Sequence, residues 1–90
     1  MIVPEEKAEL THGTVVNYWT ASFGCYTPVL LPDGAIEVLL IVMPRESGSE
    51  EEHTLHPGET FPVRDQTWKL DHVENAEDRA NWRVHIVRVS

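Results

Sequence analysis

His72 and Glu74 are the first residues whose types and spacing suggest chemistry. They stand two positions apart in the stretch from Thr67 to Asn75, which reads as a β-strand, so both side chains are expected on one face. If that face lined a cavity, the Glu74 carboxylate would orient the His72 imidazole as a general base. The alternative is a solvated strand surface of an antiparallel sheet, flanked by Lys69 and Asp71. A solvated polar face is the commoner of the two arrangements, and His72 and Glu74 are the candidate catalytic residues if the other holds.

Other groups that could bind a metal or attack a substrate are sparse. His53 and His56 have His-x-x-His spacing, which on a strand places the two rings on opposite faces, and no third ligand is evident. No metal and no cofactor are therefore expected. Cys25 is the single cysteine, and in its apolar setting it reads as a small buried hydrophobic residue; a nucleophilic role would need a nearby histidine. No phosphate-binding, dinucleotide-binding or EF-hand motif is present.

The element that must organise these residues is the apolar run from Ala35 to Met43, broken only by Glu37. Its β-branched residues favour an extended strand, and it is far shorter than the roughly 20 residues that span a bilayer. Both faces are apolar, with Ile36, Val38, Leu40 and Val42 on one and Leu39, Ile41 and Met43 on the other. Such a strand requires cover on both sides, which a short chain cannot readily supply.

Turn signals divide the rest into short strands. Pro32-Asp33-Gly34 predicts a reversal that pairs residues 26–31 with 36–43 as an antiparallel hairpin. Before it, residues 14–20 read as a strand and 21–24 as a turn or bulge. The N-terminal stretch 3–10 fits either a first helical turn or an edge strand.

The C-terminal half follows the same pattern. Residues 45–52 contain no apolar side chain and are expected to form an exposed acidic loop. A short strand at 53–56 ends at the Pro57-Gly58 turn. The change of apolar phase between Leu70 and Val73 predicts a bulge near Asp71–His72.

These elements predict one all-β domain over residues 1–90, a small antiparallel β-sandwich or partly open barrel of six to seven strands. The large side chains that would fill its core are Trp68, Trp82, Phe61 and Trp19. Trp19 is expected to be the most exposed of the three tryptophans. It and Tyr18 are the candidate ligand-binding residues.

Charge and cysteine content exclude some classes of function. Asp and Glu number 15 against 7 Lys and Arg, a net charge of −8, whereas nucleic-acid and anionic-membrane binders need a basic surface. The N-terminus has no basic start followed by an apolar segment, so no signal peptide is expected. With a single cysteine, this predicts a cytoplasmic protein.

The run His-Pro-Gly-Glu-Thr-Phe-Pro-Val-Arg-Asp-Gln-Thr-Trp-Lys-Leu-Asp-His-Val-Glu-Asn at residues 56–75, with Trp-Arg-Val-His-Ile-Val-Arg-Val at 82–89, resembles a group of small uncharacterised actinobacterial proteins. In that group a Gly-(Asp/Glu)-x-Phe turn leads into a hairpin centred on a tryptophan. The resemblance implies an all-β domain of unknown function and carries over no site residues.

Three functions follow as hypotheses. The first is a non-enzymatic interaction module that forms a homodimer through Leu39, Ile41 and Met43. The second is a small-molecule binder or minor enzyme with a pocket at the barrel mouth that uses His72 and Glu74. The third is an acidic inhibitor of a basic protein partner.

Overall fold

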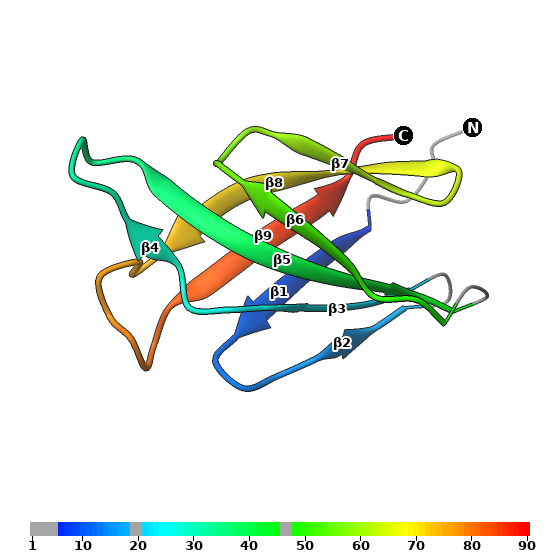
Figure 1. Ribbon diagram of the computed structural model, residues 1–90, viewed down its shortest axis with the longest axis horizontal. Coiled ribbons are helices and arrows are strands. Elements are labelled where there is room, and N and C mark those ends of the chain that lie inside the picture. The colour runs from blue at the N-terminus through cyan, green and yellow to red at the C-terminus, as the bar shows by residue number, and fades with distance from the viewer. Residues whose placement is uncertain (1–5, 19–20, 46–47) are drawn as a thin grey trace.

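The computed structural model describes residues 6–18, 21–45 and 48–90, and all regular structure in them is β-strand (Figure 1). The predicted all-β class is confirmed, with more and shorter strands than expected. The strands are β1 (Lys7–Thr11), β2 (Val16–Asn17), β3 (Ala21–Cys25), β4 (Val29–Leu30), β5 (Ile36–Pro44), β6 (Glu51–Leu55), β7 (Thr60–Val63), β8 (Gln66–Glu74) and β9 (Arg83–Arg88).

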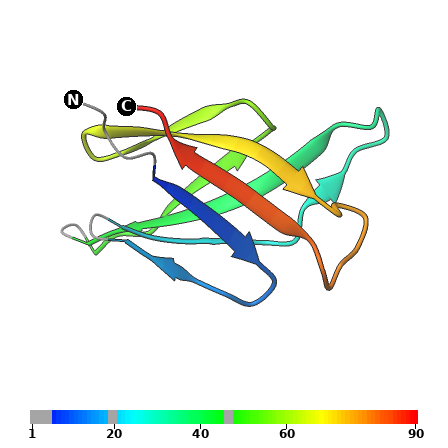
Figure 2. The ribbon, with the colours of Figure 1, turned by 180° about the vertical axis from the view of Figure 1, so that it is seen from behind.

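The strands form two antiparallel sheets that face each other across the core (Figures 1 and 2). One sheet has the order β1-β9-β8-β7. In the other, β3 and β4 pair with one side of β5, β6 pairs with its opposite side, and β2 extends the sheet beyond β3. The chain passes from one sheet to the other between β1 and β2 and again between β6 and β7, which gives a small β-sandwich.

The core between the sheets is filled by aromatic and branched side chains. The ring of Trp68 lies 4.9 Å from that of Phe23 on the opposite sheet, and its Nε1 donates a hydrogen bond to Gln66 Oε1 at 3.0 Å. Trp68, Trp82 and Phe61 are fully buried, as predicted, whereas Trp19 lies outside the described residues. Such rings bury about 150–250 Å² each, so a few of them supply much of the core of a 90-residue chain.

The long apolar run forms β5, the central strand of its sheet. Its inward residues Val38, Leu40 and Val42 are completely buried. The predicted hairpin with the preceding strand is confirmed, although β4 pairs only through Val29 and Leu30. The turn closes with a hydrogen bond from the Gly34 amide to the Leu31 carbonyl, and Gly34 has a φ of 89°, a value that favours glycine.

The prediction of a turn or bulge at residues 21–24 is wrong, because these residues lie in β3. Phe23 pairs with Val42 and is fully buried, so long-range packing overrides the small residues around it. In the stretch 14–20 only Val16 and Asn17 are described as strand.

At the N-terminus the edge-strand interpretation holds, since β1 pairs with β9 along its whole length. The predicted acidic loop 45–52 overlaps β6, which begins at Glu51, because residues 51 and 52 pair with Val42 and Ile41. The described residues of that stretch are all exposed. The predicted bulge is present, as a register shift between Leu70 and His72.

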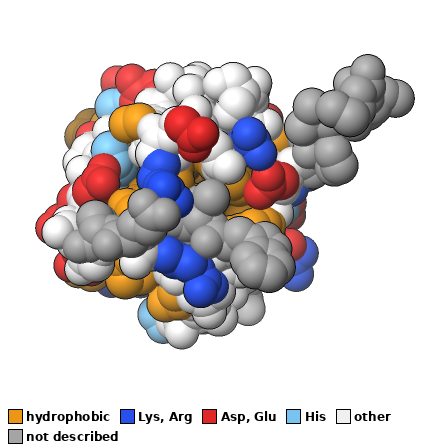
Figure 3. All heavy atoms as spheres, turned by 90° about the vertical axis from the view of Figure 1, so that its right-hand side faces the viewer, with side chains coloured by type: hydrophobic (Ala, Val, Ile, Leu, Met, Phe, Trp, Pro, Cys, Tyr) orange, Lys and Arg blue, Asp and Glu red, His pale blue; other side chains and the backbone are white. Residues whose placement is uncertain are grey.

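The end of the sandwich at the right of Figure 1 presents charges of both signs. Figure 3 views this end and shows Lys and Arg side chains interspersed with Asp and Glu. Arg88 Nη1 lies 2.7 Å from Glu6 Oε1, so β9 and the residue before β1 are joined by an ion pair. The described part of the chain contains no helix that could cross a membrane.

Candidate functional site

A bulge in β8 creates the first candidate site, on the outer face of the four-stranded sheet. Leu70 and Val73 both face the core, although three positions separate them, so the strand must accommodate one extra residue. The consequence is that two consecutive residues, Asp71 and His72, are both exposed on the outer face. Glu74 follows on that same face.

Pairing between β8 and β9 adds a residue that the sequence analysis missed. His72 lies opposite His85, and their rings stack with centroids 4.2 Å apart and planes inclined by 13°. The sequence offered one signal for His85, its position out of phase with the buried Val84 and Ile86. The partner strand and its register were not readable from spacing.

Glu74 connects the two rings. Its Oε1 lies 2.7 Å from His85 Nε2 and 3.6 Å from His72 Nε2. The interaction with His85 is the main cause that lowers the pKa of Glu74, so this side chain is a carboxylate at neutral pH. The approach to His85 is off-axis, and the buried Nε2 atom of His85 has no well-aligned hydrogen-bond partner among the described residues.

Asp71 fixes the orientation of the His72 ring. Its Oδ2 lies 2.7 Å from His72 Nδ1, and this hydrogen bond lowers the pKa of Asp71. An ionised carboxylate only accepts hydrogen bonds, so Nδ1 carries the proton. The other ring nitrogen, Nε2, faces Glu74.

Asp71, His72 and His85 border an open hollow of about 550 Å³ that β1 completes with Lys7 and Glu9. The structure therefore brings the predicted pair His72 and Glu74 together with His85, although Glu74 does not line the hollow. Their role as catalytic residues stays a prediction. The described residues hold one cluster of three potential metal ligands, His72, Glu74 and His85, whose ligand atoms all lie within 4.8 Å of one another.

The second candidate site is the outer face of the five-stranded sheet. Leu39, Ile41 and Met43 of β5 point away from the core, as the alternation of the strand predicts. Ile41 is 9% exposed, because the chain itself covers most of it, whereas Leu39 and Met43 are partly exposed. Tyr26, which is 61% exposed, continues the apolar surface from β3.

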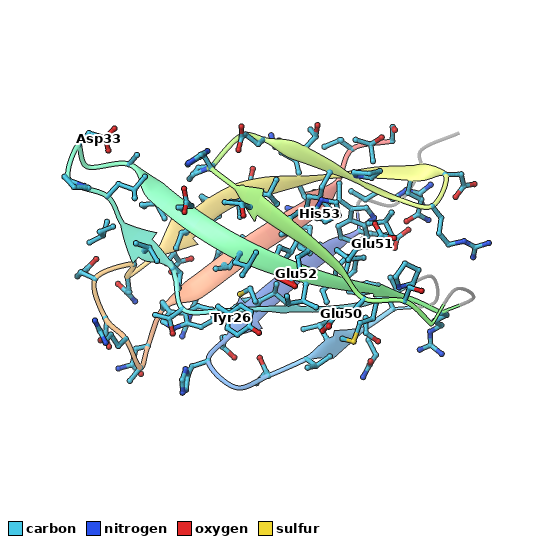
Figure 4. The ribbon with its side chains drawn as sticks, viewed as in Figure 1. Tyr26, Asp33, Glu50, Glu51, Glu52 and His53 are labelled. Atoms are coloured by element: carbon cyan, nitrogen blue, oxygen red, sulfur yellow. The ribbon has the colours of Figure 1, made fainter. Side chains whose placement is uncertain are left out.

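A notch crosses this apolar face beside an acidic border. It has a volume of about 320 Å³ and is lined by Val15, Gly24, Tyr26, Ile41, Met43 and Glu50, among others. Glu52 lies directly opposite Ile41 on β6, so its side chain shares the outer face. Figure 4 shows Tyr26, Glu50 and Glu52 around the same stretch of β5.

Comparison with known families decides what this chain belongs to. A model of a family of unknown function, DUF6406, matches residues 5–90. The chain belongs to the DUF6406 family. No curated protein and no solved structure matches it. The prediction of a domain of unknown function is thus confirmed, and family membership assigns no activity to either site.

Of the two predicted ligand-binding residues of this DUF6406 domain, Trp19 lies outside the described residues. Tyr18 donates its hydroxyl to the Lys7 carbonyl and packs edge-on against Phe23 and Trp68. Burial raises the pKa of the Cys25 thiol to about 12, so it is no nucleophile at neutral pH.

The two histidines weighed as a metal pair have separate surroundings. His53 lies against the Phe61 ring, and His56 lies 3.4 Å from Glu37 and 3.0 Å from Glu59. Neither belongs to a cluster of three metal-ligating groups among the described residues.

Proposed function

We propose that the DUF6406 domain is a non-enzymatic protein-interaction module that binds an apolar partner surface bordered by Lys or Arg through the outer face of its five-stranded sheet. The observation that carries this proposal is that β5 is apolar on both faces. Its second row, Leu39, Ile41 and Met43, lies on the outer face next to the exposed Tyr26. A contiguous apolar surface of this kind, with a polar border, is typical of protein-binding sites.

The charges on this face favour a basic partner over a second copy of the chain. Glu50 and Glu52 border the apolar surface and make no ion pair among the described residues, whereas Glu37 and Glu51 each lie near a histidine. The strands of this sheet contain no Lys or Arg, as their sequences show. Two copies of a chain with a net charge of −8 would therefore bring like charges together on this face. A partner with a basic border is complementary.

A second copy of the chain, the partner expected from the sequence, competes with a basic partner for the same face. Sedimentation velocity on the isolated protein distinguishes the two. The proposal predicts a monomer across micromolar concentrations. A dimer whose formation depends on Met43 would replace the basic partner with a second copy.

The test of the proposal uses two synthetic peptides of equal charge, one alternating Lys with Leu and the other alternating Lys with Ser. The Lys–Leu peptide is expected to bind more tightly, because only it covers the apolar row. Glu52→Lys should weaken that binding. Glu77→Lys, which makes the same change of charge at an exposed loop position, should weaken it much less.

Two results of that titration would contradict the proposal. Equal affinity for both peptides would mean that the apolar surface plays no part. Equal effects of Glu52→Lys and Glu77→Lys would mean that binding follows net charge alone.

We also propose a cytoplasmic location and an actinobacterial source. The single cysteine supports the first, since it offers no intramolecular disulfide. The resemblance of residues 56–75 and 82–89 supports the second.

A further inference from the structure

We propose that His72, Glu74 and His85 form a binding site for a divalent transition-metal ion of the zinc class, with Asp71 as the residue that orients His72. The site lies on the four-stranded sheet, on the opposite side of the sandwich from the proposed docking face, and does not depend on it. The site is built around Glu74 Oε1, which both histidine rings approach.

One ring nitrogen of His72 faces Glu74 at the centre of the cluster. The hydrogen bond between His72 Nδ1 and Asp71 Oδ2 fixes the ring, and the other nitrogen, Nε2, lies 3.6 Å from Glu74 Oε1. Imidazole nitrogen and carboxylate oxygen are both ligands of zinc, so an ion between these two atoms would bind both.

His85 supplies the third ligand. Its Nε2 is buried, lies 2.7 Å from Glu74 Oε1, and lacks a well-aligned hydrogen-bond partner among the described residues. The three side chains come from two strands that the ladder holds in fixed register. Because the two rings are stacked, one of them must turn about its side-chain bonds before both can bind the same ion. The donor set of two imidazoles and one carboxylate is the one that open, three-ligand zinc sites use.

The hydrogen bond from His72 to Asp71 is a second observation that points to a metal. Metal-binding histidines commonly donate their other ring N–H to a carboxylate, which fixes the tautomer and raises the basicity of the ligating nitrogen. Zinc bonds of about 2.0–2.1 Å place tetrahedral ligand atoms roughly 3.4 Å apart. The three ligand atoms now lie within 4.8 Å of one another, and rotation of these surface side chains can bring them closer.

The geometry also indicates which ions the site should select. Three protein ligands would leave a fourth position for water or an anionic group, and two of the ligands, His72 and His85, border the adjoining hollow. Imidazole ligands favour zinc, cobalt, nickel and copper over magnesium and calcium, which prefer oxygen donors. The site should therefore bind zinc, cobalt, nickel and copper, and excess magnesium should not compete with them.

The experiment titrates the untagged protein at pH 7.5 with Zn²⁺ by calorimetry and with Co²⁺ by visible absorption. One ion per chain is expected, with no competition from excess Mg²⁺. His72→Ala, His85→Ala and Glu74→Gln should each weaken binding by more than tenfold, and Asp71→Asn by roughly tenfold. His56→Ala is the matched control, since it removes an imidazole that also lies near two carboxylates, and it should leave binding unchanged.

Far-UV circular dichroism of each variant separates loss of the site from loss of the fold. A folded His85→Ala protein that binds Zn²⁺ as tightly as the parent would overturn the proposal. So would an absence of saturable Zn²⁺ binding by the parent, or equal losses in His85→Ala and His56→Ala. If His85→Ala does not fold, His85→Gln takes its place. It keeps a polar side chain of similar length and should show the same loss of Zn²⁺ binding.

Discussion

The imidazole rings of His72 and His85 stack face to face across two neighbouring strands, with centroids 4.2 Å apart. This contact exists because the β8 bulge turns His72 outward at the position that β9 pairs with His85. It places the only pair of stacked histidines among the described residues next to a carboxylate that both rings approach. The opposite sheet is different in character, since its outer face is apolar with an acidic border.

The two faces of β5 should differ in their contribution to stability. Leu40 is completely buried, so Leu40→Ala should lower the free energy of unfolding by about 2–5 kcal/mol. Leu39 lies on the outer face and is partly exposed, so Leu39→Ala should cost less than half as much. Urea unfolding followed by tryptophan fluorescence measures both. Equal losses would contradict the assignment of Leu39 to a free surface.

Substitution of Gly34 should lower the stability of the protein because of its backbone conformation alone. Its φ is 89°, and a Cβ there would meet no atom within 4 Å, so Gly34→Ala should lower stability by roughly 1–2 kcal/mol through strain. Gly24→Ala is the control, because its backbone is ordinary and the added Cβ would lie 3.8 Å from Val15 Cγ2, a normal contact. Thermal unfolding of the two variants should show a clear loss for the first and little change for the second. A tolerated Gly34→Ala would exclude the left-handed turn.

The Cys25 thiol should react slowly in the native protein. Burial raises its pKa to about 12, which at pH 8 leaves roughly a thousandfold less thiolate than an ordinary cysteine has. Reaction with a thiol-specific disulfide reagent should therefore be slow in buffer and fast in denaturing urea. A native rate that matches the unfolded rate would show that the thiol is accessible.

Asp78 should contribute stability that is lost in acid. Its carboxylate accepts hydrogen bonds from the Ala80 and Asn81 amides at 3.0 and 3.1 Å, and these bonds lower its pKa. Because the folded value lies below the unfolded one, the contribution is complete above about pH 4 and disappears as the pH falls through the folded pKa. The difference in stability between the parent and Asp78→Asn should shrink over that range. A difference that stays constant down to pH 2 would contradict this role.

The sequence predicted the fold class, the hairpin turn and the β8 bulge because each leaves a local signal. Pro32-Asp33-Gly34 specifies its own reversal, and the shift of apolar phase between Leu70 and Val73 requires an extra residue. The sequence did not predict β3, since the small residues around Phe23 form a strand only through pairing with β5. Nor did it predict the His72–His85 contact, which depends on the register between two strands.

The proposed docking surface on the outer face of the five-stranded sheet can be mapped residue by residue. The measurement is the ¹H–¹⁵N spectrum of the labelled protein during titration with the Lys–Leu peptide. We expect the largest shifts on Tyr26, on Leu39 to Met43 and on Glu50 to Glu52, with little change at His72 and His85. Shifts concentrated on β8 and β9, or spread evenly over all acidic residues, would contradict the proposal.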